Sequence, residues 1–192
     1  VGVLGLRLVK QTVNFDDPGA YHLYFGDDTG SPGTLLTFFE WPQAPKGKRG
    51  IGGTHHVALQ VADYDGLLKW KRRLQDLNIA VDGPYDRHYF TSIYFKDPDG
   101  LIIEIATNGP GFLIDEDEAT LGEAHRPPPQ EMMVRNRDEE AIAAEVWSEP
   151  VSVITPDMTL KMGMHHITAI GSNIQATDAF YRDVLQLQRV KK

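Results

Sequence analysis

Apolar and polar residues alternate along residues 53–61, as they do in a β-strand that buries one face. One side of this predicted strand carries an apolar row, Val57, Leu59 and Val61. The other side carries His56. The pattern therefore predicts that a rigid element presents the His56 imidazole.

Residues 92–105 are predicted to form a β-hairpin. Two β-rich runs flank Pro98-Asp-Gly100, and a three-residue loop ending in glycine would pair Tyr94 with Glu104. Glu104 then points away from the apolar face of its own strand. A carboxylate is rarely buried unless it is paired or holds a metal, so Glu104 is a candidate ligand.

The other predicted elements are placed by the same patterns. A helix with an apolar stripe is expected at about 63–77, with Asp63 as its N-cap and a stop at Asn78. The remaining expected strands are, in chain order, residues 4–13, 21–25, 34–39, 85–95 and 101–107.

Residues 111–160 change in composition. An acidic run is followed by Pro127-Pro-Pro129, and a short helix is expected at about 138–147. This composition is typical of a solvated linker between folded units.

The tail repeats the centre of the chain. Residues 163–170 match residues 53–60 at a constant offset, and Phe180 falls where Trp70 does. We therefore divide the chain into four parts. They are 1–45, a first βαβββ module without its opening strand and helix; 51–110, a complete second module; 111–160, the linker; and 163–192, the opening strand and helix of a module.

Two interpretations of the tail remain open. It completes the first module, as in a circular permutation, or it starts a further module. Completion within one chain or in a homodimer with a swapped C-terminal segment would bury Phe180 and Val184 near Leu23 and Phe25.

The composition of the chain limits its possible partners and metal ligands. The 192 residues are 41% hydrophobic and 24% charged, as in globular proteins, and no run approaches 18 apolar residues, so no membrane partner is expected. With no cysteine, metal ligands would be histidines and carboxylates. The net charge of -8 argues against nucleic acid as a partner, and the absence of a cleavage pattern at the start favours a cytoplasmic location.

Several motifs together resemble the vicinal oxygen chelate superfamily, which includes glyoxalases, bleomycin resistance proteins and extradiol dioxygenases. They are the paired histidines that open 55–59 and 165–169, the run 12–18, and the hairpin 94–104. The chain is most similar to ring-cleaving dioxygenases that act on hydroquinones or catechols. This resemblance implies an α+β fold in which paired βαβββ modules form a half-open mixed β-barrel around a metal site.

The resemblance also implies site residues. The metal ligands would be His56, Glu104 and His166, and two imidazoles with one carboxylate suit Fe(II) that binds an aromatic substrate and O2 together. Mn, Zn and Ni are the alternative metals. Tyr94 would lie near the substrate oxygen and His22 would act as an acid/base. The alternative is a half-buried strand tyrosine for Tyr94 and an exposed strand histidine for His22.

Three functions remain open at this stage. The first is an Fe(II)-dependent ring-cleaving dioxygenase. The second is a glyoxalase-like isomerase or lyase, which would require a second carboxylate ligand. The third is a metal-free protein of the same fold that binds a small molecule and confers resistance.

Overall fold

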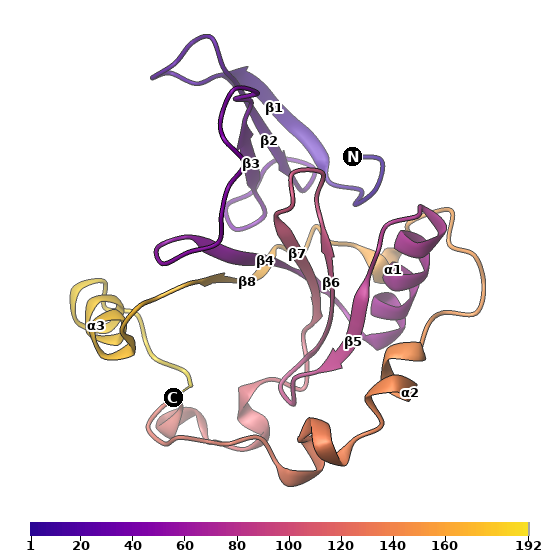
Figure 1. The fold of residues 1–192 in the computed structure, drawn as a ribbon, viewed down its shortest axis with the longest axis vertical. Helices are drawn as coiled ribbons and strands as arrows, with labels where there is room; N and C mark the ends of the chain where they lie inside the picture. Colours follow the sequence, from indigo (N-terminus) through magenta and orange to yellow (C-terminus); the bar gives the residue numbers. More distant parts are fainter. Residues whose placement is uncertain (192) are drawn as a thin grey trace.

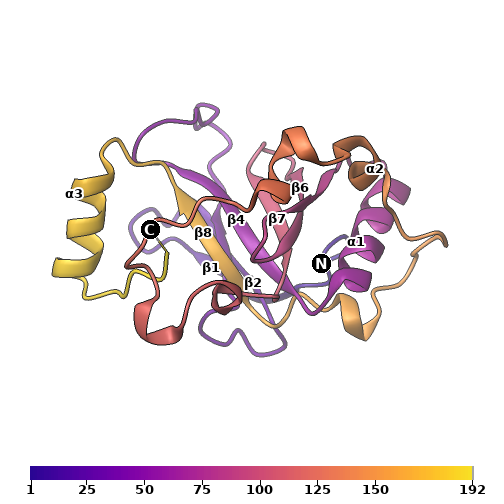
Figure 2. The same ribbon diagram turned by 90° about the horizontal axis from the view of Figure 1, so that it is seen from below.

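The computed structural model describes residues 1–191 and contains two β-sheets (Figures 1 and 2). A three-stranded sheet has the order β1 (Arg7–Val13), β2 (Tyr21–Gly26), β3 (Leu36–Phe39). A five-stranded sheet has the order β5 (Asp82–Asp86), β6 (Thr91–Lys96), β7 (Ile102–Thr107), β4 (Thr54–Val61), β8 (Met164–Ala169). All neighbours are antiparallel except β4 and β7, which are parallel. The expected α+β class is confirmed.

The helix α1 (Tyr64–Asp76) forms where the sequence predicts it. The Asp63 carboxylate accepts a hydrogen bond of 2.9 Å from the Gly66 backbone N–H, and Asn78 follows the helix with a left-handed φ of 57°. The apolar face of α1 is fully buried through Leu67, Trp70 and Leu74. α1 thereby covers one face of the five-stranded sheet.

The β6–β7 hairpin has the predicted register. Tyr94 pairs with Glu104, and the Asp97 N–H donates to the Leu101 carbonyl at 3.0 Å. The opposite face of the hairpin enters the core through Ile93, Phe95, Ile103 and Ile105. The alternation of apolar and polar residues along the two strands therefore predicted correctly which face of the hairpin is in the core.

The single strand predicted at 85–95 is instead two strands. β5 ends at Asp86 and β6 begins at Thr91, and Arg87 and His88 lie in the loop between them. The loop is sharp because His88 adopts a left-handed φ of 70°. This division supplies the third strand that a βαβββ unit requires.

Most of residues 143–152 are exposed, as expected of a solvated linker, but their backbone is bound by α1. Three consecutive basic residues of α1 donate hydrogen bonds to carbonyls of this segment: Lys71 to Ala143 and Glu145, Arg72 to Ser148, and Arg73 to Val151 and Ser152. The short helix α2 (Glu139–Ala144) forms within the predicted range. Composition correctly predicted that this segment is polar, but it did not reveal that basic side chains of α1 would bind its backbone.

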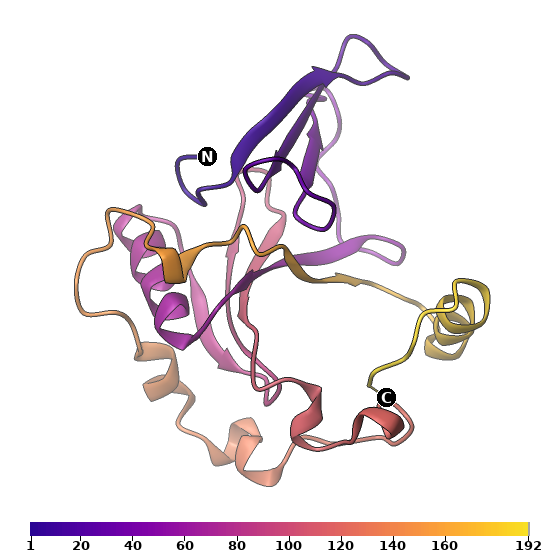
Figure 3. The same cartoon turned by 180° about the vertical axis from the view of Figure 1, so that it is seen from behind.

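The tail adopts the repeated local structure but not the expected packing. β8 pairs with β4, and α3 (Ile174–Ala179) starts at an Asn173 N-cap, the counterpart of Asp63. The following turn leaves Phe180 50% and Val184 64% exposed. Figures 1 and 3 show α3 well away from the β1–β3 sheet, because β8 carries the chain along β4 in the opposite direction. The expected burial of these side chains near Leu23 and Phe25 is therefore wrong within one chain. Their burial in a homodimer with a swapped C-terminal segment and the division into modules stay predictions.

Within residues 1–191, none of the helices is both long and apolar enough to cross a membrane.

We predict that Arg73→Met destabilises the fold by about 2–3 kcal/mol. The Arg73 guanidinium is buried and also donates to the carbonyls of Gly2 and Val3, so it ties the start of the chain to α1 and to residues 151–152. Urea denaturation measures the change. The matched control is Arg135→Met, because Arg135 is exposed. Equal unfolding free energies for the two variants would contradict the prediction.

Candidate metal centre

The strand β4, which lies between β7 and β8 in the large sheet, sets the position of three candidate ligands. Ala58 of β4 pairs with Glu104 of β7 on one side and with His166 of β8 on the other. Paired residues point to the same face of a sheet, so Glu104 and His166 extend towards each other above Ala58. His56 lies two residues earlier on β4 and therefore on the same face.

The three side chains converge on one small region. The His56 Nε2 is 2.9 Å from the Glu104 Oε2, the His166 Nε2 is 3.2 Å from the same oxygen, and the two Nε2 atoms are 3.0 Å apart. Ligand atoms on adjacent corners of an octahedron with bonds of about 2.1 Å lie about 3.0 Å apart. The residues therefore fit three adjacent positions around one ion.

The polar atoms themselves point to a cation. The Glu104 Oε2 is buried and, among residues 1–191, no group donates a hydrogen bond to it with acceptable geometry, although both Nε2 atoms are close. The Nδ1 of His56 is 2.8 Å from the Nδ1 of His55, and His166 has the same contact with His165. A ring that donates from Nδ1 keeps a free lone pair on Nε2, as a metal ligand requires.

A second layer of polar groups orients Glu104. The Tyr94 hydroxyl donates to the Glu104 Oε1 at 2.8 Å, and the Ser92 hydroxyl donates to the Tyr94 oxygen at 3.3 Å. Because Oε1 is occupied, Oε2 is the oxygen left to face the two imidazoles. The carboxylate is thus arranged to offer one oxygen.

The same contacts set the protonation of the site. Burial by itself would raise the pKa of Glu104, but polar contacts with His166, Ser92 and Tyr94 outweigh it and lower that pKa. Burial lowers the pKa of His56, and the Glu104 charge opposes this only in part. Both shifts favour the deprotonated forms that bind metals.

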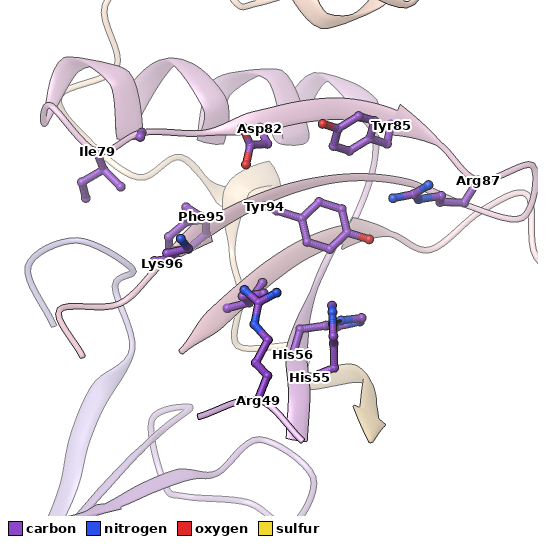
Figure 4. A pocket seen from close by; sticks show the side chains of 12 residues that line it. Arg49, His55, His56, Ile79, Asp82, Tyr85, Arg87, Tyr94, Phe95 and Lys96 are labelled. Atoms are coloured by element: carbon purple, nitrogen blue, oxygen red, sulfur yellow. Dashed lines mark hydrogen bonds between the residues drawn. The ribbon is translucent and has the colours of Figure 1, made fainter. Parts of the chain in front are cut away.

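A cavity of about 590 Å³ opens beside His56 (Figure 4). Its walls include two tyrosines, Tyr85 and Tyr94, whose ring centroids are 5.9 Å apart. Arg49 and Arg87 also line it. The cavity has the size of a small-molecule site, and of the three candidate ligands His56 lines it.

The structure brings together four of the five residues singled out from the sequence: His56, Glu104, His166 and Tyr94. It does not bring His22 to them. The His22 ring contacts Tyr24 and Phe39 on the three-stranded sheet, and its Nδ1 is 2.8 Å from the Tyr24 hydroxyl. The acid/base assignment of His22 therefore stays a prediction that these contacts do not support.

Sequence reasoning missed Ala58 and Ser92. A larger side chain at position 58 would occupy the space above the strand in which Glu104 and His166 meet. Ser92 precedes Tyr94 by two residues, so it shares a face with Tyr94. Alternation alone would have identified Ser92, whereas Ala58 acquires its role only from the pairing of three strands.

Comparison with known proteins places the chain among related sequences. The family model of the Glyoxalase/Bleomycin resistance protein/Dioxygenase superfamily matches residues 1–105. A protein of Bacillus subtilis (strain 168) named "Putative ring-cleaving dioxygenase MhqO" is 35% identical over 194 residues, which cover 100% of this chain and 50% of that protein.

Two further proteins named as dioxygenases are also similar to this chain. The "Chlorohydroquinone/hydroquinone 1,2-dioxygenase" of Sphingobium indicum is 39% identical over 115 residues, 57% of this chain and 36% of that protein. A crystal structure of a "putative dioxygenase from Bacillus subtilis subsp. subtilis str. 168" superposes with a TM-score of 0.70 at 34% identity, covering 100% of this chain and 50% of that one. The chain thus spans about half the length of the first of these relatives.

We predict that Glu104→Gln weakens Fe(II) binding by about 100-fold or more, because the amide keeps the shape but removes the charge that faces the cation. Elemental analysis after anaerobic loading and gel filtration measures bound iron. Asp82→Asn is the control, since Asp82 lines the same cavity outside the cluster. Stoichiometric iron in the Glu104 variant would exclude this residue as a ligand.

Tyr94→Phe is expected to weaken metal affinity by about 10- to 100-fold without abolishing binding, because Glu104 loses the donor that orients it. Competition with a chelator gives the affinity. Tyr85→Phe, a change on the same wall of the cavity, is expected to leave it unchanged. Equal affinities for both variants would show that the hydrogen bond to Oε1 does not orient the ligand.

Proposed function

The chain belongs to the Glyoxalase/Bleomycin resistance protein/Dioxygenase superfamily, and from this premise we propose that it carries the metal site of an Fe(II)-dependent ring-cleaving dioxygenase. Its substrates would be O2 and a dihydroxylated aromatic compound of the hydroquinone or catechol class. The observation that carries the proposal is the convergence of two imidazoles and one carboxylate within 3.2 Å of one another beside an open cavity.

The donor set supports iron over the other metals. Two histidines and one carboxylate on one face of an ion are typical of non-haem Fe(II) sites that activate O2. Iron bound by His56, Glu104 and His166 would supply the redox chemistry and the open positions for the oxygen atoms of both substrates. Zinc, nickel and manganese remain metals that the same residues can bind.

The protein groups around the ligands would hold and orient the substrate. The Tyr94 hydroxyl donates to Glu104 and accepts from Ser92, so Tyr94 contributes its ring as a wall of the cavity. Tyr85 extends this wall. A flat aromatic ring would pack against these two side chains, which limits its rotation and restricts water beside the ligands.

Two alternatives have less support. An isomerase or lyase of this superfamily would require a second carboxylate, and the cluster found among residues 1–191 contains one, Glu104. A metal-free binding protein would have no cation to balance the buried Glu104 Oε2. The names of the related dioxygenases also favour the first function.

The proposal is tested with protein loaded anaerobically with Fe(II) and then mixed with hydroquinone or catechol in buffer containing oxygen-18 gas. We expect O2 uptake that requires the substrate. The ring-opened product should contain two oxygen-18 atoms from the gas in addition to the oxygen atoms of the substrate. Protein loaded with Zn(II) serves as the control. Absence of O2 uptake with both substrates, in protein that retains stoichiometric iron, would contradict the dioxygenase function.

A further inference from the structure

Two guanidinium groups line the cavity beside the candidate metal centre. Arg49 lies in the connector before β4, and Arg87 in the loop between β5 and β6. Figure 4 shows the Arg87 side chain extending towards Tyr94 and that of Arg49 rising beside His56. Segments far apart in the sequence thus place two cations on the wall of one cavity.

Neither cation is neutralised by a neighbouring carboxylate. Among the ion pairs formed within residues 1–191, neither Arg49 nor Arg87 takes part, whereas Arg72, Arg137 and Arg182 each pair with an acidic side chain. The Arg87 guanidinium lies 5.0 Å from the Tyr85 ring centroid and 5.7 Å from that of Tyr94. Contacts with ring faces leave the N–H donors at the edge of the guanidinium free.

The local charge is opposite to that of the whole chain. The net charge of the protein is -8, yet the cavity lining contains Arg49, Arg87 and Lys96 against one carboxylate, Asp82. Two positive charges in excess at a concave surface create a potential that attracts anions. An uncharged hydroquinone would make no use of this potential.

We propose that this cavity binds aromatic substrates that carry an anionic substituent, such as a carboxylate, which Arg49 and Arg87 hold while the ring packs against Tyr85 and Tyr94. This inference rests on the proposed dioxygenase function and adds a substrate class to it. Planar guanidinium groups match carboxylates through paired N–H donors, and the charge strengthens each hydrogen bond. The two arginines would therefore select among dihydroxylated rings by charge.

The test compares two ligands that differ only in charge, 2,5-dihydroxyphenylacetate and 2,5-dihydroxyphenylacetamide. Isothermal titration calorimetry on Fe(II)-loaded protein under argon gives both dissociation constants without turnover. We expect the acid to bind about 10-fold more tightly than the amide, which corresponds to one charge-assisted interaction. This ratio should decrease as salt is added, because the arginines are solvent-exposed.

Substitutions of single residues test which side chains cause the preference for the acid over the amide. Arg49→Gln and Arg87→Gln are each expected to reduce the ratio, and the double variant to bring it close to one, while the affinity for the amide changes little. Lys48→Gln is the matched control, because it removes one positive charge next to Arg49 from an exposed residue outside the cavity lining. The control should retain the wild-type ratio.

The outcomes separate this inference from the proposed function. Equal affinities of the wild-type protein for the acid and the amide would overturn the selection by charge and leave the dioxygenase intact. A preference for the acid that survives in the double variant would overturn the assignment to Arg49 and Arg87. Failure of both ligands to bind would overturn the proposed aromatic site together with the inference.

Discussion

The register of β4 between its two neighbours is the constraint on which the site depends. One row across the sheet reads Glu104, Ala58, His166, so a carboxylate and an imidazole from the outer strands meet above a small central residue. A slip of β4 by one residue would turn His56 to the opposite face. The apolar side of the strand prevents such a slip because Leu59 and Val61 are buried in the core under α1. Hydrophobic packing on one face thus fixes the ligand geometry on the other.

Burial of Glu104 has a cost that the polar groups around it offset. A carboxylate without solvent loses several kcal/mol of hydration free energy, but polar contacts with His166, Ser92 and Tyr94 outweigh this loss and lower the pKa of Glu104. Tyr94 supplies one donor to Oε1, while Oε2 has close contacts only with the two imidazoles. Oε2 is therefore the oxygen that the proposed cation would contact. The hairpin pattern indicated a metal ligand because it predicted that this carboxylate is buried.

The family resemblance, not the residue pattern, implied that His56, Glu104 and His166 converge. Local features, in contrast, could be predicted from the residue pattern itself. The Tyr94–Glu104 register follows from loop length, and the Asp63 cap from the residue type before an apolar stripe. The position of β8 could not be deduced, because its histidine pair repeats the β4 motif without indicating that the two strands lie side by side. Phe180 was expected in a core for the same reason, whereas His22 was expected near the ligands because of the family resemblance. The hydrogen bonds from α1 to residues 143–152 could not be predicted either, since three consecutive basic residues on a helix give no sign that they will bind the backbone of a distant segment.

The metal ligands and the arginines of the cavity lie on different kinds of structure. His56, Glu104 and His166 project from three paired strands, where backbone hydrogen bonds and core packing restrict their movement. Arg49 and Arg87 come from loops, in which substitutions and insertions disturb the fold least. Substrate preference can therefore change by substitution in the loops while the ligand set stays intact. Under the proposed selection by charge, relatives that retain the three ligands can differ in the charge of the ring they accept.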